Sequence, residues 1–299
     1  AGLFTHDPGM YPRRLLLSEA RRLGVKILPI DVNKSGREYL VEKVPKKTDN
    51  PAEPEIAVRL AINELESISQ AEIERIIDGQ PFSDTADFYL RAKPSRRTLE
   101  NLALIGALDS LAAGPETTRG DILARVRQLN AIKNRKADTN QPTLDFSVLE
   151  TLPSGNAEIS RQDQISNELK IMKMDVTEHV LELYRPMLDS MGVVKSSELA
   201  RLRSKTDVLV AGVRVATQTP PMRSGKRVVF VTLDDGEGCS DSTFFDEAQA
   251  RCSHILFNTK LLLIAGKTRR TGVNGVSLMA ENAWDLRELW NNWQKSKAG

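Results

Sequence analysis

Apolar residues recur with two different periods along the chain, and the period changes near residue 207. Upstream they return every three to four positions, as on one face of a helix, and downstream they alternate, as in a strand. Five alternating segments follow: VLVAGVRVATQ, KRVVFVTLDD, SDSTFFD, KLLLIAGKTRR and GVSLMAENAWDL. The stretch EAQARCSHIL, between the third and the fourth, has helical spacing. Five short strands with one helix in that place are typical of an OB-fold, a small β-barrel.

The sequence DDGEG at residues 234–238 predicts a tight hairpin turn between the second and third strands. Asp234 and Asp235 place two carboxylates side by side in this turn. Neighbours on a strand point to opposite faces, so we interpret the pair as a solvated hairpin and not as a metal site.

The upstream part has the pattern of several helices. The segment RRLLLSEARRLGV predicts an amphipathic helix that ends near Gly24, with ILPIDVN as a strand behind it. Residues 55–111 have a helical pattern throughout, and Ser69 with Glu72 fits a capping box at the start of one helix. A basic amphipathic helix is predicted over residues 119–136. Helical spacing resumes over residues 164–188.

These patterns predict an α+β multidomain protein, in which an all-helical unit precedes a five-stranded OB-fold β-barrel. Residues 44–54 gather Pro, Lys, Asp and Asn, and residues 137–161 lose periodicity, so both have the composition of linkers. We expect a first unit at 1–50, a helical domain at 51–136, a linker at 137–163, a helical connector at 164–204 and the barrel with a C-terminal tail at 205–299.

Composition limits the chemistry further. The chain has 299 residues, enough for two or three domains, and its 42 Lys and Arg nearly balance its 40 Asp and Glu. DNA contact would therefore depend on local patches and not on bulk charge. Two cysteines without a CxxC pair and three scattered histidines give neither a zinc spacing nor a disulfide framework. No run of 18 apolar residues and no signal peptide is found, so we expect a cytoplasmic protein without a membrane partner.

Three separate parts of the chain, in order, are similar to one polymerase family. The first is GMYPRRLLLSEARRLGVKILPIDVN, the second runs from EIAVRLAINELESISQAEIERIIDGQ to LENLALIGALDSL, and the third is the barrel with VVFVTLDDGEG and LLLIAGKTRR. Together they resemble the C-terminal third of bacterial C-family DNA polymerases, the polymerase III alpha subunits and their relatives. The resemblance is greatest to the damage-inducible, error-prone polymerase of the mutasome.

This resemblance implies that residues 1–50 are the end of a fingers-like region, residues 51–136 a helix-hairpin-helix domain and residues 205–299 an OB-fold domain. The whole enzyme would be a DNA-directed DNA polymerase, a nucleotidyltransferase that uses dNTPs and magnesium for translesion synthesis. In the family the metal ions are held by palm carboxylates, which have no counterpart in this chain. We therefore expect no catalytic residue, no metal site and no cofactor within it.

The barrel carries cations and rings suited to a single DNA strand. A basic strip close to phenylalanines supplies charge for the phosphates and faces for base stacking. Phe244 and Phe245 must face opposite ways, so only one of them can belong to the core. The alternative is that the rings are core and the barrel is a protein docking surface. The candidate DNA-binding residues are Arg214, Lys226, Arg227, Lys267, Arg269, Arg270 and Phe245.

The hairpin of the helical domain departs from the family pattern. Residues 66–69 read Glu-Ser-Ile-Ser where the family commonly has glycines that let backbone amides approach a phosphate. Nine acidic residues against two arginines between residues 50 and 89 give a local charge of about −7, which repels phosphates. We therefore favour a structural or protein-docking role for this hairpin over DNA binding.

Two segments are candidates for partner binding. Gln141, Leu144 and Phe146 resemble the short peptide with which polymerases engage the sliding clamp, and the alternative is an ordinary loop anchored on its own domain. Trp290 and Trp293 lie on one face of a predicted terminal helix, which either covers the barrel or enters a groove of a partner.

The resemblance implies three partners: DNA as a single-stranded template or primer-template, an adaptor of the mutasome that is an inactive Y-family-like subunit, and the sliding clamp. The alternative function is a stand-alone OB-fold adaptor that binds single-stranded DNA or proteins without polymerase activity.

Overall fold

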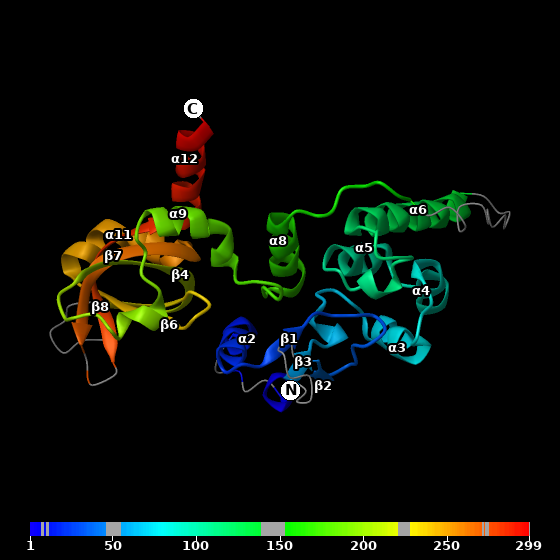
Figure 1. The fold of residues 1–299 in the computed structure, drawn as a ribbon, viewed down its shortest axis with the longest axis horizontal. Coiled ribbons are helices and arrows are strands. Elements are labelled where there is room, and N and C mark those ends of the chain that lie inside the picture. Colours follow the sequence, from blue (N-terminus) through cyan, green and yellow to red (C-terminus); the bar gives the residue numbers. More distant parts are fainter. Residues whose placement is uncertain are drawn as a thin grey trace. The chain divides into compact units, whose positions relative to one another are not determined.

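The computed structural model describes residues 1–6, 9, 12–45, 55–138, 153–220, 228–270, 272 and 275–298. They form two compact units, one of Ala1–Gly9 with Val25–Glu178 and the other of Met10–Gly24 with His179–Gly299. Figure 1 shows the barrel within the second unit and the helices α3 to α6 within the first. This architecture of a helical region and a closed five-stranded barrel confirms the predicted fold class.

A small sheet opens the first unit, after the short helix α1 (Gly2–His6). Its strands are β1 (Lys26–Leu28), β2 (Leu40–Val44) and β3 (Glu55–Arg59). The central strand β3 pairs in parallel with β1 and antiparallel with β2, so the sheet joins residues from both sides of position 50. The helical expectation for residues 55–59 was wrong. Backbone pairing on both sides, with Ala57 and Val58 buried, favours the strand there.

Helices complete the first unit, and polar caps begin most of them. Ser69 and Glu72 form the predicted capping box. Asp84 caps α4, Ser95 caps α5 and Ser160 caps α8 through side-chain oxygens that accept backbone N–H bonds. The elements are the 3-10 turn η1 (Ile62–Glu64), α3 (Gln70–Gly79), α4 (Thr85–Ala92), α5 (Arg96–Leu104), the 3-10 turn η2 (Asp109–Leu111), α6 (Arg119–Asp138) and α8 (Arg161–Met172).

The second unit is built on the barrel. Its strands are β4 (Asp207–Gln218), β5 (Val229–Asp234), β6 (Cys239–Phe244), β7 (Leu261–Arg270) and β8 (Val276–Asp285). They close in the order β4-β5-β6-β8-β7, and α11 (Asp246–Asn258) lies between β6 and β7 in sequence. The five strands and the helix between the third and fourth of them are as predicted. Inward side chains such as Val231, Phe244 and Leu278 form a continuous apolar core.

Helices that precede and follow the barrel in the sequence complete the second unit. The helix expected over residues 164–188 is interrupted before it reaches this unit: α8 ends at Met172, and Lys173 follows in the left-handed conformation. The chain resumes as the 3-10 turn η3 (Val180–Tyr184), then α9 (Arg185–Ser190) and α10 (Ser196–Leu199). The remaining two are α2 (Arg13–Arg22), which is the predicted N-terminal helix, and α12 (Leu286–Ala298).

The β5–β6 turn corrects one interpretation from the sequence. The hairpin is present, but the first of its two carboxylates is buried: Asp234 is 2% exposed and accepts a hydrogen bond from Ser18 of α2 (3.1 Å). Asp235 accepts from the backbone and hydroxyl of Ser196 (both 2.7 Å). Packing of α2 and α10 onto this turn buries Asp234 and leaves Asp235 only partly exposed, where the local pattern suggests two solvated side chains.

Among the described residues, no three His, Cys, Asp or Glu side chains come together in a way that could hold a metal ion. In the same part of the chain, no helix is both long enough and apolar enough to cross a bilayer.

Candidate nucleic-acid interface

The strand register brings four outward side chains into a row across the barrel. Phe230 on β5 pairs with Thr243 on β6, Thr243 with Met279 on β8, and Met279 with Lys267 on β7. Paired residues of neighbouring strands share a face of the sheet. Phe230 is 37% exposed and Met279 44% exposed, so this face lies outside the core. We call these four residues the outer row.

A second outward row runs beside the first. It consists of Thr232, Asp241, Ser277 and Arg269, again in register. Thr232 donates its hydroxyl hydrogen to Asp241 (2.6 Å), which holds that carboxylate on β6. Arg269 is exposed, and the described residues include no ion pair of its guanidinium. The two rows together present an apolar ring, a thioether and an exposed cation on one curved surface.

The other predicted DNA-binding cations of the barrel differ in whether their charged groups already contact the protein. Lys267 pairs with Asp207, and its ammonium also lies 3.6 Å from Glu281, which raises the pKa of Lys267. Arg270 donates to the backbone carbonyl of Ala200 (2.7 Å) and Arg214 to that of Leu256 (2.9 Å), so both guanidinium groups hold the fold together. Lys226 and Arg227 lie outside the described residues.

The aromatic residues separate as the alternation predicts. Phe244 is fully buried, whereas Phe245 is 41% exposed at the start of α11. Sequence reasoning did not select Phe230 or Met279 as site residues. A signal was present: in VVFVTLDD the ring is out of phase with Val229, Val231 and Leu233, and these three are all buried.

Three of the four backbone amides of the hairpin at residues 66–69 are paired within its own unit. The N–H of Glu66 donates to the carbonyl of Ile171 (3.1 Å), that of Ile68 to Leu65 (3.3 Å) and that of Ser69 to the Glu72 carboxylate (3.1 Å). Lys173 pairs with the Glu66 carboxylate at 3.2 Å. Amides that are already paired cannot also bind a phosphate, which supports a structural role for this hairpin.

The terminal tryptophans form a small aromatic cluster on α12. Trp290 and Trp293 stack with ring centroids 5.0 Å apart, and Tyr184 meets Trp290 edge-on at 5.4 Å. Lys297 lies 4.5 Å above the Trp293 ring. Leu286, at the start of the helix, is fully buried in the barrel unit, while both tryptophans remain half-buried. The other predicted partner residues, Gln141, Leu144 and Phe146, lie outside the described residues.

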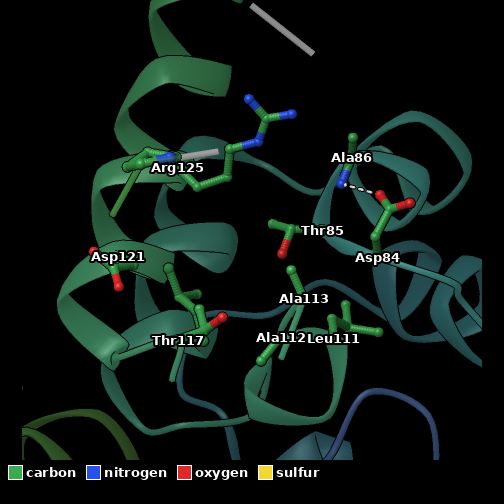
Figure 2. A pocket seen from close by; sticks show the side chains of 11 residues that line it. Asp84, Thr85, Ala86, Leu111, Ala112, Ala113, Thr117, Asp121 and Arg125 are labelled. Atoms are coloured by element: carbon green, nitrogen blue, oxygen red, sulfur yellow. Dashed lines mark hydrogen bonds between the residues drawn. The ribbon is translucent and has the colours of Figure 1, made fainter. Parts of the chain in front are cut away.

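A cleft of about 350 Å³ lies in the first unit, where sequence reasoning gave no candidate (Figure 2). Its walls come from α4, α6 and the segment after η2, and include Thr85, Leu111, Ile122 and Arg125. Asp84 stands at its edge with its carboxylate accepting from the N–H of Ala86 (2.8 Å). Burial lowers the pKa of Arg125.

Comparison with known proteins finds sequence similarity to error-prone DNA polymerases. A model described as the helix-hairpin-helix motif matches residues 24–118. An error-prone DNA polymerase of Symbiobacterium thermophilum is 28% identical over 86% of this chain, and one of Azoarcus sp. (strain BH72) is 28% identical over 95%. The chain spans 26% of the length of each of these relatives.

A solved single-stranded DNA binding protein from the mitochondria of S. cerevisiae, Rim1, shares 12% identity with this chain. The match covers 27% of this chain and 94% of that protein, with a TM-score of 0.23, too low for the two folds to be called the same. The relationship of the chain therefore rests on sequence. It is a relative of the error-prone DNA polymerases along nearly its whole length, which confirms the resemblance predicted from the sequence.

Proposed function

We propose that this chain is the DNA-handling and partner-docking portion of an error-prone translesion DNA polymerase, and that the residues catalysing nucleotidyl transfer lie outside it. The observation that carries the proposal is the outer row with Arg269 beside it, on an OB-type barrel of a chain related to error-prone polymerases. The fold and the relationship each favour DNA as the ligand.

The barrel surface suits a single strand for a physical reason. Unpaired bases expose apolar faces, which stack on the Phe230 ring and pack against the Met279 thioether. A phosphate of the bound strand then lies beside Arg269 of the neighbouring row, which supplies a positive charge. The Asp241 carboxylate on β6 repels phosphates, so we place the phosphate contact of this row at β7. We infer that the strand crosses β5, β6, β8 and β7 roughly along the outer row.

Partner docking is the finer part of the proposal. The Trp290 and Trp293 rings retain exposed surface on a helix whose base is anchored by Leu286. Large, half-buried aromatic rings are common anchors at protein interfaces. We propose that they dock the mutasome adaptor, and that Gln141, Leu144 and Phe146 engage the sliding clamp.

Photocrosslinking tests the proposed path of the strand. A 20-nucleotide oligothymidine carrying 4-thiothymidine, bound to the full chain, is irradiated, and the crosslinked tryptic peptides are identified by mass spectrometry. We expect crosslinks to the peptides that contain Phe230 and Met279. Crosslinks confined to the helical unit, or none above a non-binding control protein, would contradict the proposal.

A further inference from the structure

Four cations gather at the turn that joins α4 to α5, next to the hairpin at residues 66–69. Lys93 ends α4 in the left-handed conformation (φ 47°), Pro94 is buried behind it, and Arg96 and Arg97 begin α5. Arg75 of α3 donates to the carbonyl of Ala92 at 2.8 Å and therefore adds its charge to the same turn. Helices α3 and α4 pack against each other in the first unit (Figure 1).

A hydrogen bond to the Glu72 carboxylate of α3 fixes the α4–α5 turn. The Glu72 carboxylate, already part of the capping box with Ser69, also accepts from the backbone N–H of Ser95 at 2.7 Å. The same group therefore ties the α4–α5 turn to the hairpin at residues 66–69. Three of the cations, Lys93, Arg96 and Arg97, stay exposed on this fixed base. Positive charges on a rigid support lose little conformational entropy when they meet a fixed pattern of phosphates.

The charges at this turn are only partly compensated. Arg96 pairs with Glu100 of the following helical turn at 3.0 Å. Within the described residues, no ion pair of Lys93 or Arg97 is found. The acidic residues that give the preceding segment its negative charge lie at or before Asp87, and Asp87 itself pairs with Arg91 at 2.9 Å. The balance of charged residues therefore changes sign along the sequence of the helical domain.

We propose that the α4–α5 turn, through Lys93, Arg96 and Arg97, binds the phosphate backbone of duplex DNA in place of the hairpin at residues 66–69. Residues 91–97 contain no Phe, Tyr or Trp, so this surface offers charge without a stacking platform. Recognition of phosphates without base stacking suits a paired duplex, whose bases are not accessible, better than a single strand. The inference rests on the proposed function, because it supplies the contact to the duplex part of a primer-template.

Equilibrium binding of the full chain to two labelled probes tests the inference. The probes are a 20-base-pair blunt duplex and a 20-nucleotide oligothymidine, each followed by fluorescence anisotropy over a range of KCl concentrations. The test variant is Lys93→Ala with Arg96→Ala and Arg97→Ala. The matched control removes the same number of exposed cations from other helices of the unit, as Arg127→Ala with Arg161→Ala and Lys170→Ala.

The test variant should bind the duplex about tenfold or more weakly than the unchanged chain at low salt. Its slope of log affinity against log salt should fall by about one for each phosphate that the variant no longer neutralises. The control variant should keep most of the duplex affinity, and both variants should bind oligothymidine as the unchanged chain does. Equal duplex binding by the test and control variants, or no duplex binding by the unchanged chain, would overturn the inference.

Two further measurements distinguish recognition of phosphates by charge from other effects of the substitutions. Arg96→Lys with Arg97→Lys preserves the charges and should keep duplex binding, whereas a loss in that variant would contradict recognition of phosphates by point charge. An unchanged melting temperature of the alanine variant shows that its effect is not unfolding. Failure of the unchanged chain to bind oligothymidine, with duplex binding intact, would count against the proposed function of the barrel and not against this turn.

Discussion

The Ser18 hydroxyl donates a hydrogen bond to the Asp234 carboxylate at 3.1 Å, although 216 positions separate the two residues in the sequence. The imidazole Nε2 of His179 lies 3.5 Å from the same carboxylate, and the Nδ1 of that ring accepts from the N–H of Leu181 (3.3 Å). The guanidinium of Arg14 on α2 also lies 3.2 Å from that Nε2. Helix α2 is thereby fastened to the barrel and to η3 at one buried point.

Removal of the Asp234 carboxylate should destabilise the barrel unit. Asp234→Ala leaves the buried Ser18 hydroxyl without its acceptor and the buried His179 ring without the carboxylate beside it, which we expect to cost about 3 kcal/mol of unfolding free energy. Asp241→Ala, at an exposed site of the neighbouring strand, should cost less than about 1 kcal/mol. Urea unfolding followed by tryptophan fluorescence measures both. Equal losses in the two variants would show that the buried contact contributes no more than an exposed one.

The Glu72 carboxylate should make stability depend on pH in the acid range. Burial opposes its ionisation, but hydrogen bonds from Ser95 and Ser69 outweigh burial and lower its pKa to about 2. Since an unfolded Glu titrates near pH 4.3, the ionised form adds about 3 kcal/mol above that pH, and this is lost as the pH falls toward about 2. Glu72→Gln should flatten the unfolding free energy of the helical unit over this range. A profile that is unchanged in the variant would assign the acid sensitivity to other carboxylates.

Much of this fold could be predicted from the sequence, because its strongest signals are local. The alternation after residue 207 and the Ser69–Glu72 capping box each depend on neighbouring residues, and both are present in the structure. The strand β3 could not be predicted in the same way, because its stability comes from pairing with β1 and β2. Burial of Asp234 depends likewise on a helix from the other end of the chain, which no local pattern contains.

The site was less predictable than the fold. A count of basic residues selects Arg269 and Arg270 equally, but only the structure shows that Arg270 is bonded to the carbonyl oxygens of Ala200 and Leu202. The outer row joins residues from four strands whose register depends on the whole barrel.

Substitution of the two adjacent arginines of β7 should affect different properties, DNA binding in one case and stability in the other. Arg269→Ala should weaken oligothymidine binding and lower its salt slope by about 0.7, the value for one phosphate contact with a single strand, without lowering the melting temperature. Arg270→Ala should lower the unfolding free energy by about 0.5 to 1.5 kcal/mol, because it removes the hydrogen bonds to the carbonyl groups of Ala200 and Leu202. Anisotropy and thermal unfolding of both variants provide the measurement. Interchanged results would exclude Arg269 as the phosphate contact.

In the C-terminal helix α12, we expect Leu286 to contribute to stability and Trp293 to partner binding. Leu286→Ala should cost about 2 to 5 kcal/mol, because this side chain is fully buried. Trp293→Ala should cost about 1 kcal/mol at most, since its ring is only half-buried, but should abolish co-purification with the mutasome adaptor. Adaptor binding that survives Trp293→Ala and Trp290→Ala together would remove the aromatic cluster from the interface.

The binding of single-stranded DNA to the barrel is tested most directly by one pair of phenylalanine substitutions. Phe230→Ala and Phe257→Ala remove rings that are exposed to a similar degree, 37% and 46%, but only Phe230 lies in the outer row. Anisotropy with a 20-nucleotide oligothymidine at fixed salt should show Phe230→Ala weakened by about 1 to 3 kcal/mol, the range for removing the ring on which one base stacks. Phe257→Ala should bind as the unchanged chain does. Equal affinity of the two variants would contradict a strand path along the outer row.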